Sequence, residues 1–283
     1  MHPLDPFGFG RPGFLRHARS FSAIDADLRG RTIAVTGANS GLGLAASAAL
    51  AALGATVWML CRDLARGEAA RAGLPGDLRL ARLDVADLAS VRALDVPTPD
   101  VLVHNAGMLA ATRETVGGLE RTVATHVVGP YLLDERLRPA ASIWVASGGM
   151  YTQRLDVDAT FSPPDPFDGV AAYARCKRAQ VVLARRSGQH AMHPGWADSP
   201  GVATSLPRFR RITKSILRTP DEGADTIVWL AALLAAPLTR PVPAPAFWFD
   251  RAAAPEHVFP WTKVPVEDED RLIARVREAA ARA

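Results

Sequence analysis

The chain has 283 residues, of which 48% are hydrophobic and 22% charged, with two cysteines and a formal net charge of +4. These proportions are typical of a globular protein with one substantial core, and they exclude disulfide-rich, collagen-like and disordered classes. No apolar run reaches the roughly 18 residues of a membrane span, and neither a secretory signal nor a nucleic-acid motif is visible, so we expect a cytoplasmic protein without an integral membrane segment or a nucleic-acid partner.

Short apolar runs alternate with helical segments along most of the chain. Strands are predicted at 33–35, 56–60, 78–80, 101–103, 142–145 and 246–249, with one more in the polar stretch 189–192. Helices are predicted at 44–53, 64–72, 118–133, 170–186, 220–235 and 267–281. This alternation predicts a single α/β domain: a doubly wound, Rossmann-type parallel sheet of about seven strands, with helices on both faces and a ligand crevice at the carboxyl ends of the strands.

The first 29 residues differ from the rest, because phenylalanines and arginines alternate there. Gly8, Gly10 and Pro12 interrupt any amphipathic helix, so we favour an arm packed on the sheet edge over a membrane-surface role. The predicted divisions are an N-terminal arm at 1–29, the sheet domain at 30–250 with a substrate lid at about 196–218, and a C-terminal extension with a terminal helix at 251–283.

A glycine-rich turn follows the first predicted strand. Gly37 permits the tight turn, while Gly41 and Gly43 leave room where backbone approaches a pyrophosphate and where helix meets sheet. The helix N-terminus adds free N–H groups and a positive dipole end. Placed between a strand and an alanine-rich helix, the turn predicts a dinucleotide site formed by Gly37, Asn39, Ser40, Gly41, Leu42 and Gly43.

The end of the second predicted strand bears on the choice of dinucleotide. Arg62 stands where an arginine accommodates the 2′-phosphate of NADP, and its planar fork suits phosphate. Asp63 beside it argues in the other direction, since an acidic residue there binds the ribose hydroxyls of NAD. We expect NADP(H) as the preferred cofactor, with NAD(H) as the alternative.

Further along the chain, Tyr173 stands four residues before Lys177 and downstream of Ser147. With these residues the chain resembles a short-chain dehydrogenase/reductase from about residue 31 to 234. The resemblance rests on the glycine turn, Ser147, Tyr173, Lys177, Leu83-Asp84-Val85, His104-Asn105-Ala106-Gly107 and Pro194-Gly195.

The resemblance implies a role for each of these positions. Asp84 and Val85 would contact the adenine, and Asn105, Ala106 and Gly107 would pass beside the adenosine ribose. Pro194, Gly195 and Ser199 would line the nicotinamide, and Ser147, Tyr173 and Lys177 would form the catalytic group. Relatives pair through the helix that carries the tyrosine, which implies a homodimer or homotetramer.

Hydride transfer requires a proton to enter or leave the reacting oxygen. The ordinary pKa of a tyrosine is near 10, too high for a base at neutral pH. Lys177 lies one helical turn beyond Tyr173, and its charge, with that of the nicotinamide, is expected to lower the pKa of Tyr173. Ser147 would hydrogen-bond the substrate oxygen.

One position departs from the family pattern. The family has an asparagine three residues before a glycine in the helix ahead of the fifth strand, and here His126 stands at that distance from Gly129. The asparagine holds a water that links the lysine to solvent. An imidazole can also bind water, and packing in the core is the alternative; the sequence leaves both open.

These features predict an NADP(H)-dependent oxidoreductase that interconverts an alcohol and a carbonyl. The mixture of apolar and basic residues in the predicted lid would suit an apolar or lipid-like small molecule, or an acidic one, and a helix with an ordinary solvated face explains the pattern equally well. The alternative is an NADP(H)-binding sensor or scaffold with weakened catalysis, motivated by His126. The other histidines lack metal-ligand spacing, so no metal is expected.

Overall fold

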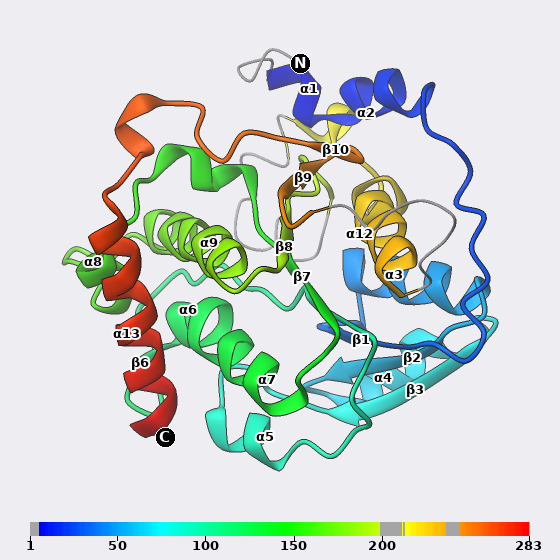
Figure 1. The fold of residues 1–283 in the computed structure, drawn as a ribbon, viewed down its shortest axis with the longest axis horizontal. Helices are drawn as coiled ribbons and strands as arrows, with labels where there is room; N and C mark the ends of the chain where they lie inside the picture. Colours follow the sequence, from blue (N-terminus) through cyan, green and yellow to red (C-terminus); the bar gives the residue numbers. More distant parts are fainter. Residues whose placement is uncertain (1–5, 199–210, 212, 236–243, 283) are drawn as a thin grey trace.

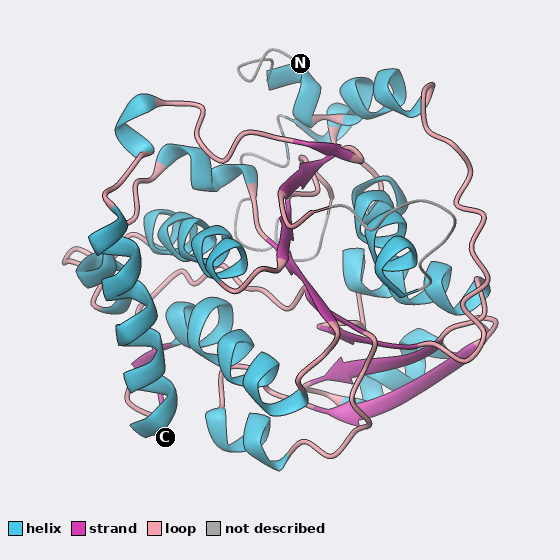
Figure 2. Ribbon diagram, viewed as in Figure 1, coloured by secondary structure: helices cyan, strands magenta, loops and turns pink. Residues whose placement is uncertain are grey.

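Eight strands form the central sheet of the computed structural model, which describes residues 6–198, 211, 213–235 and 244–282 (Figures 1 and 2). Their order is β10-β9-β8-β7-β4-β1-β2-β3, and neighbours are parallel except for the antiparallel pair β9 and β10. The strands are β1 (Thr32–Thr36), β2 (Thr56–Cys61), β3 (Asp77–Arg82), β4 (Val101–His104), β7 (Ala141–Val145), β8 (His190–Met192), β9 (Phe247–Phe249) and β10 (Ala252–Ala253).

The strand order reverses at β1. The chain runs from β1 outward to β2 and β3, then crosses back to β4 and continues through β7, β8 and β9 on the other side. In sheets of this kind the ligand crevice lies beyond the carboxyl ends of the strands at this reversal. The predicted fold class is therefore confirmed; the strand that the sequence did not indicate is the two-residue β10.

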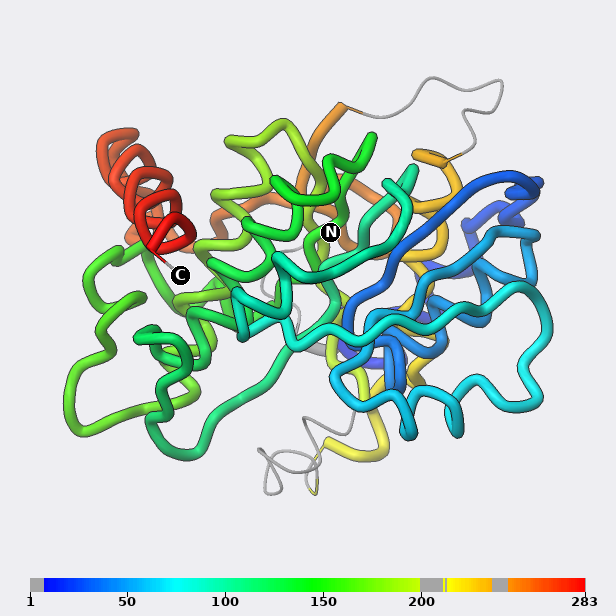
Figure 3. The backbone as a smooth tube through the Cα atoms, turned by 90° about the horizontal axis from the view of Figure 1, so that it is seen from below, coloured from blue at the N-terminus to red at the C-terminus, as the bar shows by residue number. Residues whose placement is uncertain are grey.

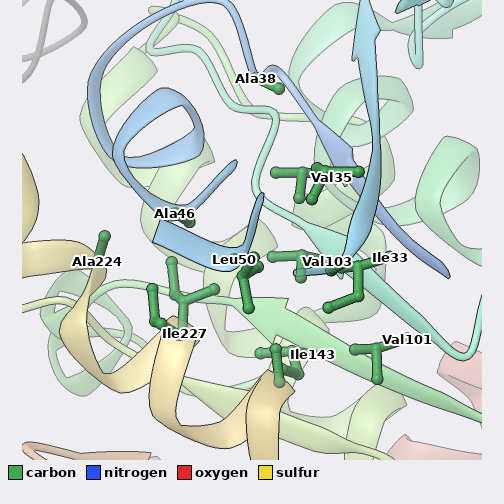
Figure 4. Packing of buried hydrophobic residues seen from close by; sticks show 14 of the residues in the cluster. Ile33, Val35, Ala38, Ala46, Leu50, Val101, Val103, Ile143, Ala224 and Ile227 are labelled. Atoms are coloured by element: carbon green, nitrogen blue, oxygen red, sulfur yellow. The ribbon is translucent and has the colours of Figure 1, made fainter. Parts of the chain in front are cut away.

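One face of the sheet packs against α3 (Gly41–Ala52), α4 (Leu64–Arg71) and α12 (Pro220–Ala235). Alternation along β1 sends Ile33 and Val35 to this face and Ala34 to the other, so both faces are buried and the strand is apolar throughout. Figure 4 shows side chains of α3 and α12 meeting those of the central strands: Ala46, Leu50, Ala224, Ile227, Val101, Val103 and Ile143.

The opposite face is covered by a second set of helices. They are α5 (Leu88–Ala93), α6 (Arg121–Val123), the π-helical η1 (Ala124–Val128), α7 (Gly129–Leu137) and α9 (Gly169–Arg186), and the short helix α8 (Val157–Phe161) packs on α9. The helix predicted at 118–133 thus begins at Arg121 and continues to Leu137. A hairpin of β5 (Thr115–Val116) and β6 (Leu119–Glu120) precedes it, because Gly117 and Gly118 both take positive φ in its two-residue turn.

The terminal helix α13 (Val266–Arg282) lies across α7, α8 and α9. Figures 1 and 3 place it at the end of the molecule away from β2 and β3. Glu269 pairs with Arg185 at 2.6 Å and with Arg186 at 3.3 Å. Every residue of α9 from Cys176 to Ala184 is buried.

The polar strand β8 is accommodated by hydrogen bonds between side chains. His190 is 3% exposed, and its Nδ1 accepts a hydrogen bond of 3.0 Å from Nε1 of Trp248 in β9. Gln189, just before the strand, accepts from the main-chain N–H of Ser142 at 2.7 Å. The polar side chains of Gln189 and His190 are therefore hydrogen-bonded to the two neighbouring strands.

The described residues also include three short 3₁₀ helices: η2 (Gly148–Thr152), η3 (Lys214–Ile216) and η4 (Pro260–Thr262). The N-terminal arm forms two short helices, α1 (Pro6–Phe9) and α2 (Arg11–Ala18), which lie beside β9 (Figure 1). Most of the predicted lid lies outside the described residues.

Candidate active site

A cavity of about 690 Å³ opens at the carboxyl ends of β1, β2, β3, β4, β7 and β8. It brings together most of the site residues predicted from the sequence: Gly37, Asn39, Ser40, Gly41, Leu42, Arg62, Asp84, Val85, Asn105, Ala106, Gly107, Ser147, Tyr173, Lys177, Pro194 and Gly195. Gly43 and His126 lie behind the wall, and Ser199 is outside the described residues. The set spans about 160 positions of sequence, so the strand order is what gathers it.

The glycine turn is tightly packed against the end of β4. A Cβ on Gly43 would collide with the Asn105 amide nitrogen and would lie 2.6 Å from the Gly37 carbonyl oxygen, so no side chain fits at this point. The Asn105 Nδ2 donates to the carbonyl oxygens of Thr36 at 2.9 Å and Gly37 at 3.3 Å. Asn105 therefore stabilises the glycine turn. This role is separate from the position beside the ribose that the resemblance implied for it.

Helix α3 begins directly at this turn. Its N-cap residue, Ser40, makes no side-chain capping hydrogen bond. The first N–H groups of the helix, at Gly41 and Leu42, belong to residues that line the cavity. A helix N-terminus of this kind favours an anion, through both its N–H groups and its dipole.

Helix α9 carries the tyrosine and the lysine. It begins at Gly169 because Asp168 caps it, accepting from the N–H groups of Val170 at 2.9 Å and Ala171 at 3.1 Å. One turn separates Tyr173 from Lys177, so both face the cavity, with the Lys177 Nζ 5.4 Å from the centroid of the tyrosine ring.

Ser147 completes this group from the loop after β7. A hydrogen bond joins the side chains of Tyr173 and Ser147. The Lys177 Nζ donates to the carbonyl oxygen of Val145 at 2.7 Å, which fixes the lysine to the end of β7. The hydroxyl, the phenol and the ammonium thus meet at one side of the cavity.

Burial is the largest influence on the pKa values of Tyr173 and Lys177. It raises the pKa of Tyr173 to about 12, partly opposed by the hydrogen bond with Ser147. It lowers the pKa of Lys177 to about 7, since a buried ammonium loses its hydration. The pKa of Tyr173 was expected to be lowered by Lys177 together with the nicotinamide; in the polypeptide alone, the loss of water around the phenol raises it instead.

The depressed pKa of Lys177 predicts a pH-dependent stability. Between pH 7 and 10.5 the unfolded chain protonates this lysine and the folded chain does not, so the free energy of unfolding rises with pH over this window. Lys177→Met removes that dependence. Relative to wild type, the variant should gain most stability at pH 6 and progressively less by pH 10.

Urea unfolding at pH 6, 8 and 10 measures this difference. Lys263→Met, at an exposed lysine, is the matched control and should show no such trend. A stability difference between Lys177→Met and wild type that stays constant with pH would show that the lysine is charged in the folded protein across the range.

His126 lies in the π-helical turn η1, four residues before Pro130. A proline ring clashes with the carbonyl four residues earlier and supplies no N–H, and the π turn accommodates both effects. The widened turn closes with the Gly129 N–H donating to the Ala124 carbonyl oxygen. The bulge therefore follows from Pro130 and determines where His126 projects.

The imidazole of His126 is fully buried. Its Nε2 lies 2.8 Å from the Met108 carbonyl oxygen, and its ring meets the ring of Tyr173 edge-on at 5.2 Å. Its Nδ1 has no hydrogen-bond partner among the described residues. Burial, reinforced by the charge of Lys177, holds the pKa of His126 well below its ordinary value, so the ring is neutral. The ring therefore packs against Tyr173, while a role of His126 in binding water through its Nδ1 stays a prediction.

Two arginines close to Arg62 were not singled out from the sequence. Arg66 lines the main cavity with Arg62, and Arg82 lines an adjoining hollow of about 490 Å³ that Arg62 also borders. The signal for Arg66 was its position four residues after Arg62, in the first turn of α4. Asp63, which seemed to favour NAD, instead caps α4 by accepting from the Arg66 N–H at 3.1 Å.

Neither a metal centre nor a membrane-spanning helix is found within the described ranges. No group of three or more histidine, cysteine or acidic side chains there could hold a metal ion. No helix in the same part of the chain has both the length and the apolar character needed to cross a membrane.

Comparison with known proteins places this geometry in context. A short chain dehydrogenase sequence profile matches residues 31–140. The chain is 35% identical to dehydrogenase/reductase SDR family member 12 of Bos taurus, over 97% of this chain and 94% of that protein. It is 30% identical to retinol dehydrogenase 14 of Mus musculus, over 72% and 74% respectively. An uncharacterized protein from Mycobacterium paratuberculosis has a similar solved structure, with a TM-score of 0.71, 26% identity and coverage of 92% and 97%.

Proposed function

The chain belongs to the short-chain dehydrogenase/reductase family and is an oxidoreductase acting on CH–OH and C=O groups; from this premise we propose that it is an NADP(H)-dependent enzyme that interconverts an apolar alcohol and its carbonyl, with Tyr173 as the proton donor and acceptor. The observation that carries the proposal is the meeting of Ser147, Tyr173 and Lys177 in the cavity that the glycine turn also lines.

When bound, the nicotinamide supplies or accepts the hydride, and the protein's residues position the substrate and move the proton. The Ser147 hydroxyl hydrogen-bonds the substrate oxygen and holds it within reach of Tyr173. With a pKa of about 12, the phenol keeps its proton at neutral pH, which suits donation to a carbonyl oxygen in the reducing direction. Lys177, whose pKa of about 7 leaves a substantial part of it protonated at neutral pH, lies close enough to favour the phenolate left behind, and the Val145 carbonyl oxygen holds its Nζ in place.

The charge at the adenosine end supports NADP(H) over NAD(H). Within the described part of the chain, the side chains of Arg62, Arg66 and Arg82 make no ion pair or hydrogen bond, whereas most arginines of this chain do. Unpaired guanidinium groups around one hollow suit a phosphate dianion. The Asp63 carboxylate is engaged at the start of α4, so it does not compete for the ribose.

The lining of the other end supports an apolar substrate. Met108, Leu109, Val170 and Trp196 border the cavity there. Arg121 also borders it, but Glu114 neutralises its charge at 2.8 Å. The murine relative is named a retinol dehydrogenase, and retinol is an alcohol of this chemical class.

The direct test is turnover. Purified protein is incubated with NADPH or NADH and a panel of aldehydes and ketones graded from short and polar to long and apolar, and cofactor oxidation is followed by absorbance. We expect oxidation of NADPH with the apolar members of the panel. Tight binding of NADPH without oxidation across the whole panel would overturn the proposal.

That negative result is what a second candidate function predicts: a cofactor-binding sensor or scaffold with weakened catalysis. It is favoured by the packing of His126, which fills the place beside Tyr173 and Lys177 with a neutral ring. In this case His126→Asn should raise kcat by about tenfold or more, because the smaller amide leaves room for a water near the lysine.

The same measurement on His257→Asn is the control. That histidine is only partly buried and bonds Thr262 instead of lying beside the cavity. No gain in His126→Asn, together with wild-type turnover on the panel, would eliminate the sensor.

A further inference from the structure

A buried ion pair lies behind the segment that follows β8. Arg218 and Asp250 are 1% and 2% exposed at their side chains, and the guanidinium meets the carboxylate through two hydrogen bonds of 2.5 and 2.9 Å. The guanidinium also lies over the rings of Phe14 and Phe249, 5.2 and 4.9 Å from their centroids. Neither charged residue lines the cavity.

The main chain of Arg218 holds the cavity wall directly. Its N–H donates to the Trp196 carbonyl oxygen at 2.8 Å, and its own carbonyl oxygen accepts from the Asp198 N–H at 2.9 Å. Trp196 and its neighbours Pro194, Gly195 and Ala197 line the cavity on this side. We call Pro194–Ala197 the wall segment.

The side chain of Arg218 lies directly behind the wall segment and limits how far this segment can move away from the cavity. Gly195 has a φ of +73°, and a Cβ there would lie 2.5 Å from the Arg218 Nε. The wall segment is therefore pressed against the guanidinium at a point where only glycine fits. Displacing Arg218 would displace the wall.

The N-terminal arm supplies the rest of this support. The Phe9 carbonyl oxygen accepts from the Trp196 N–H at 2.8 Å and from the Arg218 Nε at 3.0 Å. The Gly8 carbonyl oxygen accepts from the Arg218 Nη2 at 3.1 Å. From α2, the His17 Nδ1 lies 2.7 Å from the Asp250 carboxylate, which can only accept, so this nitrogen carries the proton.

Stability of the fold does not by itself explain the Arg218–Asp250 ion pair. A buried ion pair gains little over an apolar replacement, because both charges lose their hydration. Asp250 also has a φ of +48°, an unfavourable conformation for a residue other than glycine. The buried Arg218–Asp250 ion pair, which joins the N-terminal arm to the wall segment, therefore points to a functional role at the cavity.

We propose that the arm is part of the cofactor site, and that Arg218 is a positioning residue that holds the wall segment against the nicotinamide half of the bound dinucleotide. This rests on the proposed function for the identity of the ligand. Asp250 orients the guanidinium, His17 orients Asp250, and Gly8 and Phe9 take up the remaining donors. Loosening the joint should weaken binding of the nicotinamide half and leave the adenosine half unaffected.

The variants are chosen to keep the protein folded. Arg218→Lys retains the charge and loses the fork, and His17→Ala removes the outermost support while leaving the ion pair. His17→Asn restores a donor at the same reach as Nδ1. Arg11→Ala is the matched control, because Arg11 also joins α2 to the body, through Glu222 at 2.8 Å, without touching Asp250 or the wall segment.

Two measurements are made on the full chain. Hydrogen exchange of peptides covering 194–198 reports on the wall without any ligand. Calorimetry gives Kd for NADPH and for adenosine 2′,5′-bisphosphate, which lacks the nicotinamide half. We expect faster exchange in Arg218→Lys and His17→Ala, and a Kd for NADPH raised about tenfold in the first and threefold in the second. The Kd for the bisphosphate should be unchanged, and His17→Asn and Arg11→Ala should match wild type.

Unchanged exchange at 194–198 would overturn the inference whatever the ligand. Faster exchange with an unchanged Kd for NADPH, or an equal loss of affinity for both ligands, would overturn the role in cofactor binding. If wild type binds the bisphosphate but not NADPH, the proposed function fails instead, and the exchange data still decide whether the arm holds the wall.

Discussion

Tyr173→Phe should lower kcat/KM for carbonyl reduction by about a thousandfold or more while leaving the fold and the Kd for NADPH nearly unchanged. The Tyr173 phenol is the proton donor that the site holds beside Ser147. The raised pKa of this phenol keeps it protonated at neutral pH. Phenylalanine preserves the ring and its edge contact with His126, so what is removed is the proton and not the packing.

Tyr151→Phe is the matched control. That hydroxyl is also buried, but it donates to the Pro255 carbonyl oxygen at 2.8 Å and does not border the cavity. Its loss should reduce stability by about 1 kcal/mol, the usual contribution of one hydrogen bond, with kcat/KM within a few-fold of wild type. Comparable turnover in both variants would remove Tyr173 from the proton transfer.

The second large effect concerns the choice of cofactor. Arg62→Ala should raise the Kd for NADPH about a hundredfold, or about 2.7 kcal/mol, and change the Kd for NADH by little, because only NADPH carries the 2′-phosphate. Arg66 and Arg82 border the same region and would retain part of the attraction. The ratio of kcat/KM for the two cofactors measures the same preference in turnover.

Arg79→Ala gives the comparison for this experiment. Arg79 lies on β3 close to Arg82, but it pairs with Asp77 at 2.8 Å, stacks over Trp58 and borders neither hollow. It removes one positive charge without touching the site, and both affinities should stay at the wild-type value. Equal losses for NADPH and NADH in Arg62→Ala would place this arginine away from the 2′-phosphate.

The sheet and the glycine turn could be predicted from the sequence because their signals are local. Apolar runs such as 33–35 and 101–103 mark strands that are buried on both faces, and the positions of Gly37 and Gly43 follow from the turn between strand and helix. The convergence of Arg62, Asp84, Ser147 and Tyr173 then follows from strand order, which short-chain dehydrogenases share.

The features that could not be predicted from the sequence depend on contacts between residues far apart along the chain. The fit of β8 depends on Trp248 meeting His190, 58 residues apart. The pKa of Tyr173 depends on how completely its surroundings exclude water, which no spacing reveals. In the sequence Arg218 is one of many scattered arginines. Its structural role depends on contacts with residues 8, 9 and 250, which are distant in sequence.

Helix α13 also changes what can happen between two copies of this chain. The tyrosine-bearing helix α9, through which relatives were expected to pair, is contacted by α13, which pairs through Glu269 with Arg185 and Arg186 at the end of α9. Association through that face would first require 17 residues to detach and the contacts of Glu269 with two arginines to break. Self-assembly through that face would thus compete with the packing of α13 against α7 and α9.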